Sequence, residues 1–138
     1  MSDLKDIRWK QRFENYHKAY TFLEKYCIQD TFSELERAGF IQMFESAFEL
    51  SWKVLRDYLE AEGFQVNSPR QAIKKSFEIG LIQDGEIWLK ALADRNLTVH
   101  TYDEVKAEEL IILIKNEYLP LLRSLYRRLA GELNQCLD

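Results

Sequence analysis

The sequence predicts an all-α fold, an antiparallel up-and-down bundle of four or five helices. Apolar residues recur along most of the chain at the three- and four-residue spacing of a helix face. Only five glycines and two prolines interrupt the 138 residues, whereas a sandwich or a barrel needs many turns. No stretch carries a competing strand pattern. We expect residues 1–138 to form a single domain, because no repeat, low-complexity tract or change of composition divides them.

Two long helices are expected in the first half of the chain. The first carries a stripe with steps of four and three residues, formed by Trp9, Phe13, Tyr16, Tyr20, Leu23 and Cys27. The second extends from about residue 31 to residue 62, and its stripe comprises Ile41, Phe44, Phe48, Trp52, Leu55 and Leu59, with Leu35 expected to join it. Gly63 follows at a position typical of a helix stop. Long paired helices favour an antiparallel bundle.

A short third helix is predicted from its capping residues. Ser68 and Gln71 match a capping box, and Pro69 suits the first helical position. The apolar residues expected to point inward from this helix are Ala72, Ile73 and Phe77.

Two further helices follow. Asp84 is expected to cap the first of them, whose apolar pattern continues to Arg95. Thr101 and Glu104 match a second capping box, which begins a final helix that reaches about residue 133. Pro120 predicts a kink or a break within this last helix.

Composition indicates which binding partners and which cellular compartment to expect. The net charge is −4 and the sequence pI is near 5.3, which argues against extensive nonspecific binding to a nucleic-acid backbone but still allows a local basic groove. Cys27 and Cys136 lie far apart, and no apolar signal segment begins the chain, so we expect a reduced, cytoplasmic setting. The most apolar run, residues 110–114, is too short to span a membrane.

The segment from Arg95 to Tyr102 is the candidate site, because residues capable of proton and phosphate chemistry gather there. It contains an arginine, a histidine and a tyrosine. Elsewhere we find no glycine-rich phosphate loop, no zinc spacing and no repeated Glu-x-x-His pairs of the kind that a di-iron bundle needs, so we expect no metal and no cofactor. A purely structural reading stays open, in which Arg95 caps its helix, His100 fills a loop and Tyr102 is a buried staple.

Arg95-Asn96, three further residues and His100-Thr101-Tyr102 resemble the Arg-x4-His-x-Tyr motif of the HEPN superfamily. Within it, the chain is similar to the group called nucleotidyltransferase substrate-binding proteins, also interpreted as HepT-like toxins paired with a minimal nucleotidyltransferase antitoxin. The resemblance covers nearly the whole chain, including the aromatic first helix, residues 48–53 and residues 68–70. It implies a homodimer in which two Arg-x4-His segments meet, and metal-independent RNA cleavage in active members.

The resemblance also implies a role for each residue of the motif. His100 is the catalytic acid or base, since imidazole, with a reference pKa of about 6.5, can take a proton from an RNA 2′-hydroxyl or return one to the leaving oxygen. Arg95 is the catalytic cation that clamps the phosphate. Asn96 is a supporting residue that hydrogen-bonds backbone or phosphate. Tyr102 is the residue to which the nucleotidyltransferase adds AMP, whose bulk and charge would repel RNA.

Three functions follow as hypotheses. The first is a HEPN-type toxin, an endoribonuclease neutralised when the nucleotidyltransferase adds AMP to Tyr102. The second is a non-catalytic subunit that presents substrate to a nucleotidyltransferase, which the acidic net charge favours slightly. The third is a bundle that acts only as an interaction module. All three predict a homodimer, and the first two predict a nucleotidyltransferase partner.

Overall fold

The computed structural model describes residues 2–95 and 103–137, and over these residues its regular structure is entirely helical. The segments are α1 (Ser2–Tyr26), α2 (Glu34–Ala61), α3 (Pro69–Glu78), α4 (Gly85–Asp94), α5 (Glu104–Leu113), the π-helical η2 (Ile114–Tyr118) and α6 (Leu119–Leu137). Because α5, η2 and α6 follow one another without interruption, they make one long helix. The described chain therefore forms five helical rods, and the all-α bundle predicted from the sequence is confirmed.

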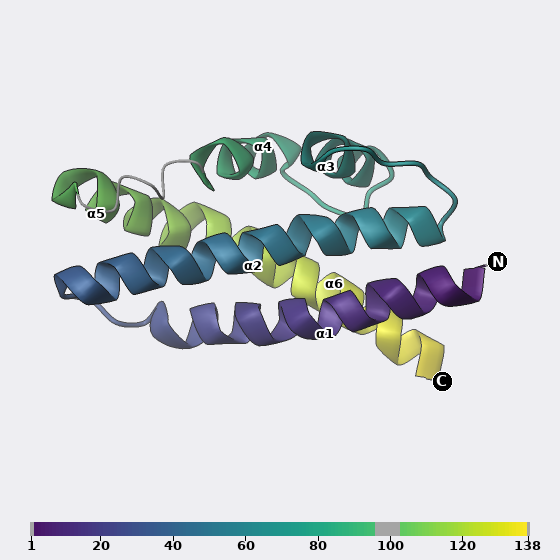
Figure 1. Ribbon diagram of the computed structural model, residues 1–138, viewed down its shortest axis with the longest axis horizontal. Coiled ribbons are helices and arrows are strands. Elements are labelled where there is room, and N and C mark those ends of the chain that lie inside the picture. Colours follow the sequence, from purple (N-terminus) through teal and green to yellow (C-terminus); the bar gives the residue numbers. More distant parts are fainter. Residues whose placement is uncertain (1, 96–102, 138) are drawn as a thin grey trace.

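The second helix, α2, is the centre of the bundle. It runs antiparallel beside α1, and it also contacts α3, α5 and α6 (Figure 1). The shorter helices α3, α4 and α5 follow one another along one side of α2, and the long last helix then runs back across the bundle. Every element that flanks the candidate site is thus placed by its contact with α2 or with a direct neighbour of α2.

The aromatic stripe of α1 and the apolar stripe of α2 form the core. Five of the six residues predicted for the α1 stripe are buried, and Cys27 is partly buried. On α2, Phe44 and Leu55 are fully enclosed, whereas the side chain of Trp52 is partly exposed. The prediction for Leu35 is wrong, because 84% of this residue is exposed. It lies in the first turn of α2, at the end of the bundle.

Both ends of α2 have clear local causes. Ser33 and Glu36 form a capping box, with the Glu36 amide donating to Ser33 Oγ at 3.1 Å and the Ser33 amide donating to Glu36 Oε1 at 2.7 Å. The helix therefore begins a few residues later than the apolar pattern alone suggested. The stop predicted at Gly63 is confirmed, since this glycine has a φ of 98°, in the left-handed region that glycine adopts readily.

Helix α3 begins as predicted but buries a different side chain. Ser68 Oγ accepts from the Gln71 amide at 3.1 Å, and Gln71 Oε1 accepts from the Asn67 amide at 2.8 Å, one residue before the expected capping-box partner. Ala72 and Ile73 are buried as expected. Phe77 is 48% exposed, so its predicted inward position is wrong, and Ser76 is the buried residue instead.

The caps predicted for the next two helices are also wrong. Asp84 precedes α4 with left-handed backbone angles (φ 56°, ψ 49°), and its side chain makes no capping hydrogen bond. Helix α5 is capped by Asp103, whose Oδ1 accepts from the Lys106 amide at 3.2 Å, and not by Thr101, which lies outside the described residues. At α4 the left-handed conformation of Asp84 replaces the extended one that a capping residue usually has, and at α5 Asp103 lies directly before the first helical residue.

The chain continues through Pro120 without a break. Proline has no N–H, so it cannot donate to the carbonyl one helical turn before it. The preceding turn widens into η2, in which the Leu119 amide donates to the Ile114 carbonyl five residues earlier. The irregularity predicted at Pro120 is thus a π-helical turn within a continuous helix. Among the described helices, none combines the length and the apolar character needed to cross a membrane.

Candidate functional site

The candidate segment joins α4 to α5, and the structure describes its first residue. Arg95 directly follows the last residue of α4. Asn96, His100 and Tyr102 lie outside the described residues, and the described part of the site comprises Arg95 and the anchors on either side of the segment.

Arg95 is held by an ion pair with α2. Its Nη1 donates to Oε1 of Glu49, and the two side chains are 26% and 35% exposed. The other carboxylate oxygen of Glu49, Oε2, accepts from Trp52 Nε1 at 2.9 Å. Because Glu49 is fixed within its own helix, it also fixes the guanidinium of Arg95. Arg95 lies at a helix C-terminus, where the helix dipole favours a cation.

The η2 turn holds α4 on a second side. The Tyr118 hydroxyl donates to Oδ2 of Asp94, the residue before Arg95. Lys90, one turn earlier on α4, pairs with Glu117 at 3.1 Å. Burial of Tyr118, together with the adjacent Asp94 carboxylate, raises the pKa of this phenol well above its ordinary value. The hydroxyl therefore stays protonated as a donor to Asp94.

Aromatic rings support both of these polar contacts. Phe44 of α2 stacks on Tyr118, with ring centroids 5.6 Å apart and an interplanar angle of 21°. Phe48 of α2 packs against Trp88 of α4, with centroids 5.8 Å apart. These rings enclose the inner side of α4 between α2 and η2. The end of α4 is consequently fixed by packing as well as by hydrogen bonds.

The polar contacts of Glu49 continue along α2 into α1. The Arg56 guanidinium lies 5.3 Å from the Trp52 ring centroid. Asp57, whose side chain is 1% exposed, accepts from Arg56 Nε and from Arg12 Nε, both at 3.0 Å. A continuous series of charged and aromatic side chains thus connects Arg95 to the first helix.

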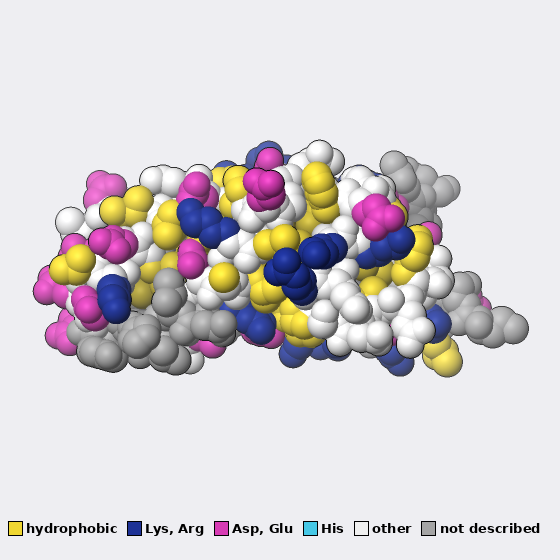
Figure 2. Space-filling view, turned by 90° about the horizontal axis from the view of Figure 1, so that it is seen from above, with side chains coloured by type: hydrophobic (Ala, Val, Ile, Leu, Met, Phe, Trp, Pro, Cys, Tyr) yellow, Lys and Arg dark blue, Asp and Glu magenta, His cyan; other side chains and the backbone are white. Residues whose placement is uncertain are grey.

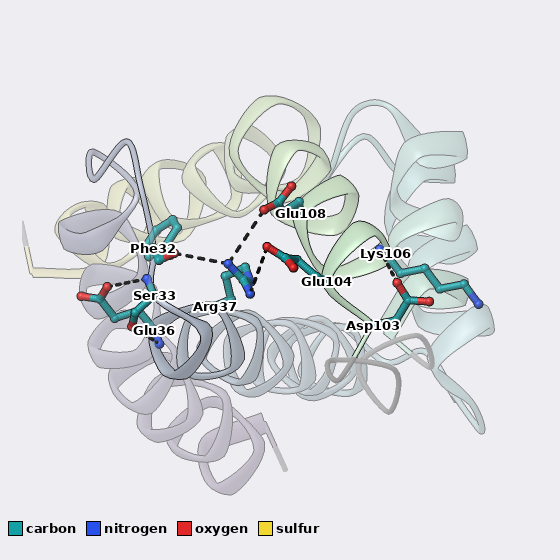
Figure 3. Close-up of polar contacts among 8 residues, drawn as sticks. All are labelled: Phe32, Ser33, Glu36, Arg37, Asp103, Glu104, Lys106 and Glu108. Atoms are coloured by element: carbon teal, nitrogen blue, oxygen red, sulfur yellow. Dashed lines mark hydrogen bonds and ion pairs between the residues drawn. The ribbon is translucent and has the colours of Figure 1, made fainter.

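On the downstream side, Arg37 anchors the start of α5 to α2. Its guanidinium lies 3.7 Å from Glu104 and 3.8 Å from Glu108, and it donates to the Phe32 carbonyl at 3.4 Å (Figure 3). Asp103 caps α5 next to these contacts. Both flanks of residues 96–102 are therefore attached to α2, the upstream flank through Glu49 and the downstream flank through Arg37.

The sequence predicted Arg95 but not the residues that hold it. Glu49 and Tyr118 carry no local motif, and their partners lie 46 and 24 positions away in sequence. The one sequence signal for Glu49 was its place between Phe48 and Trp52 on a helix face. Chemically, the arrangement offers a positioned guanidinium whose carboxylate partner a phosphate can replace. No cluster of three metal-ligand side chains occurs within the described residues.

These contacts define a class of small helical bundle. In it, the segment between two shorter helices, here residues 96–102 between α4 and α5, is anchored on both sides to a long central helix, here α2. The family model described as "nucleotidyltransferase substrate binding protein like" matches residues 11–131, and the chain belongs to this family. The resemblance to this group inferred from the sequence is therefore confirmed.

Individual relatives agree with this assignment. A Haemophilus influenzae protein named probable ribonuclease HepT is 33% identical over 85 residues, which cover 58% of this chain and 56% of that protein. The chain thus matches a little over half the length of this curated relative. A solved Thermus thermophilus structure superposes with a TM-score of 0.76 at 36% identity, covering 83% of this chain and 98% of its own.

A second solved structure has the same fold. It comes from Haemophilus influenzae and is described as revealing the fold of a substrate-binding domain of a nucleotidyltransferase. It superposes with a TM-score of 0.76 at 25% identity, and covers 86% of this chain and 98% of its own.

Proposed function

We propose that the protein is a HEPN-type toxin, a metal-independent endoribonuclease that a nucleotidyltransferase neutralises by adding AMP to Tyr102. The observation that carries the proposal is the position of Arg95, which is fixed on α2 at the start of the Arg-x4-His-x-Tyr segment. The relative named probable ribonuclease HepT and the family description support the two halves of the proposal, RNA cleavage and a nucleotidyltransferase partner.

The reaction needs a base, an acid and a phosphate clamp. His100 of one protomer takes the proton from an RNA 2′-hydroxyl, whose oxygen attacks the adjacent phosphorus. The bond from phosphorus to the 5′-oxygen breaks, and His100 of the second protomer, in its protonated form, gives that oxygen a proton. The products are a 2′,3′-cyclic phosphate and a 5′-hydroxyl. A homodimer is part of the proposal because one chain carries one such histidine.

Arg95 stabilises the charge that builds on the phosphate oxygens. To do so, its guanidinium exchanges the Glu49 carboxylate for phosphate, one anionic partner for another. Asn96 supports the segment by a hydrogen bond to backbone or phosphate. Addition of AMP to Tyr102 introduces a competing phosphate close to Arg95 in sequence and blocks RNA by bulk and charge repulsion.

The test is cleavage of tRNA and mRNA by the purified protein, with Arg95→Ala and His100→Ala as inactive variants. Adding the cognate nucleotidyltransferase and ATP should suppress cleavage, and mass spectrometry should find AMP on Tyr102. Equal cleavage by wild type and both variants would refute a catalytic role for the motif. Suppression that persists in a Tyr102→Phe variant would refute the proposed mode of neutralisation.

A second candidate function is a non-catalytic subunit that presents substrate to the nucleotidyltransferase. The ion pair between Arg95 and Glu49 favours it, because a guanidinium already satisfied by a carboxylate can be a structural element. This alternative predicts complex formation with the nucleotidyltransferase, AMP transfer to another molecule and no RNA cleavage by the isolated protein.

A further inference from the structure

One end of the bundle carries the excess negative charge of the protein. Residues 27–37 and 103–115 contain seven carboxylates and three basic side chains, a net charge of −4. The whole chain has the same net charge, so its remaining residues are neutral in sum. These residues form the α1–α2 loop, the first turn of α2 and α5, which lie together at one end (Figure 1). Figure 2 shows acidic side chains gathered at the end that holds α5.

Large apolar side chains are exposed at this same end. Ile28 and Leu35 are 83% and 84% exposed, and Val105 and Ile112 on α5 are 64% and 58% exposed. Val105, Glu108, Glu109 and Ile112 have the spacing of one helix face, here called the α5 stripe. Several large apolar side chains exposed near one another are unusual on a monomer and typical of an interaction site.

A groove of about 350 Å³ lies between the α5 stripe and the α1–α2 loop. Residues 30–32 line one side of it, and Glu108, Ile111 and Ile112 line the other. Its basic residues serve the fold: Arg37 pairs with Glu104 and Glu108 (Figure 3), and Lys115 donates to the Gln29 carbonyl. Asp30 and Glu109 remain exposed at the surface. A partner in this groove therefore meets apolar side chains bordered by negative charge.

We infer that this end face, formed by the α1–α2 loop, the first turn of α2 and the α5 stripe, is the docking surface for the nucleotidyltransferase. The inference rests on the proposed function and adds where that partner binds and what surface it presents, namely apolar side chains flanked by lysine or arginine. Charge complementarity selects a basic protein surface as the occupant. RNA is the wrong occupant, because carboxylates repel its phosphates.

The position of the end face relative to Tyr102 supports the same partner. Helix α5 begins at Glu104, two residues after Tyr102. In any polypeptide, two residues span at most about 7 Å. An enzyme bound along the α5 stripe is thus within reach of the tyrosine that it modifies.

The test compares two double variants with the same change of charge. Glu109→Lys with Ile112→Lys alters the end face, and Glu14→Lys with Leu4→Lys alters exposed positions of α1. The Kd for the purified cognate nucleotidyltransferase is measured by calorimetry at two salt concentrations. We expect the end-face variant to bind at least tenfold more weakly and to receive AMP more slowly, and the α1 variant to stay within twofold of wild type. Circular dichroism melts check folding, and the milder Ile112→Ser is measured beside them.

Each other outcome overturns the inference in a recognisable way. If wild type and the end-face variant bind the nucleotidyltransferase equally, the docking surface lies elsewhere and the proposed function stands. If wild type does not bind the nucleotidyltransferase, the docking surface and the proposed neutralisation both fail, and the RNA assay decides separately whether the proposed cleavage stands. RNA affinity is measured in a His100→Ala background. A loss of RNA affinity in the end-face variant, with nucleotidyltransferase binding unchanged, would show that this end binds nucleic acid instead.

Discussion

Replacing Glu49 by glutamine removes the negative charge that faces Arg95 and keeps the size of the side chain. The amide keeps a single carbonyl oxygen, which can still accept from Trp52 Nε1 and so hold the side chain in its position on α2. The NH2 group of the amide then takes the place of Oε1, so Arg95 loses its anionic acceptor at this position. If Glu49 competes with RNA for the guanidinium, the glutamine variant binds RNA more tightly than wild type.

The size of the effect follows from the geometry of the guanidinium. A phosphate that takes a hydrogen bond from Arg95 lies about 6 Å from a carboxylate bonded to the same group. With an effective dielectric constant of about 50, between those of a protein surface and bulk water, the repulsion is about 1 kcal/mol. That energy corresponds to about fivefold in affinity. The partly exposed ion pair itself contributes less than about 1 kcal/mol to stability, so the variant remains folded.

The assay is fluorescence anisotropy with a labelled RNA, in a His100→Ala background that prevents cleavage. Glu45→Gln, one turn earlier on α2, makes the same change of net charge at a different carboxylate and is the matched control. Equal affinities for the two glutamine variants would refute competition by Glu49. A weaker affinity for Glu49→Gln would show instead that the carboxylate holds Arg95 in the orientation that phosphate requires.

Three further predictions concern stability. Asp57→Ala leaves Arg12 and Arg56 without their buried carboxylate and should lower the free energy of unfolding by about 3 kcal/mol in urea titrations; a loss below about 1 kcal/mol would contradict this. Burial and the Glu24 carboxylate raise the pKa of Tyr20 to about 12. The contribution of the protonated Tyr20 to stability is therefore complete below about pH 10 and is lost as pH rises toward 12. Tyr20→Phe should flatten this part of the curve of unfolding free energy against pH. Gly63→Ala should lower the free energy of unfolding by about 1–2 kcal/mol, because the φ of Gly63 is 98°. Gly39→Ala should raise it by about 0.5–1 kcal/mol, because Gly39 lies within α2 and a Cβ there meets no atom within 4 Å. Thermal melts measure both variants, and equal effects would refute the role of the backbone angle.

The helices could be predicted because burial leaves a periodic record in the sequence. Residues such as Phe44 and Phe48 repeat at the helical period because the same side of α2 faces the core along its length. The pattern fails where packing ends or local geometry intervenes. Leu35 continues the apolar stripe in sequence, but it lies at the end of the bundle and is exposed. In α3, Phe77 is half exposed, and the adjacent Ser76 is buried in its place. The spacing of apolar residues describes the buried face of a single helix. It does not show how far the neighbouring helices extend along that face.

The site was predictable only in part for a related reason. Arg95 belongs to a local motif, whereas Glu49 is set against it by how α4 packs on α2. The contact between Tyr118 and Asp94 depends on a π-helical turn, and neither residue marks that turn in the sequence. Pro120 signalled an irregularity nearby but not its form. Contacts between distant segments follow from the rotation of whole helices, which single residues do not encode.

The five residues of η2 also set the rotational phase of the last third of the chain. A turn with one residue more than an α-helical turn rotates everything after it by about 100° relative to an uninterrupted α-helix. Before this turn the long helix faces α2, within it Tyr118 reaches α4, and after it α6 faces α1. Deleting one residue here would rotate the apolar side of α6, with Leu122, Leu125 and Leu129, away from α1. The length of this short segment therefore couples the packing of α6 on α1 to the contacts that hold the end of α4, directly before Arg95.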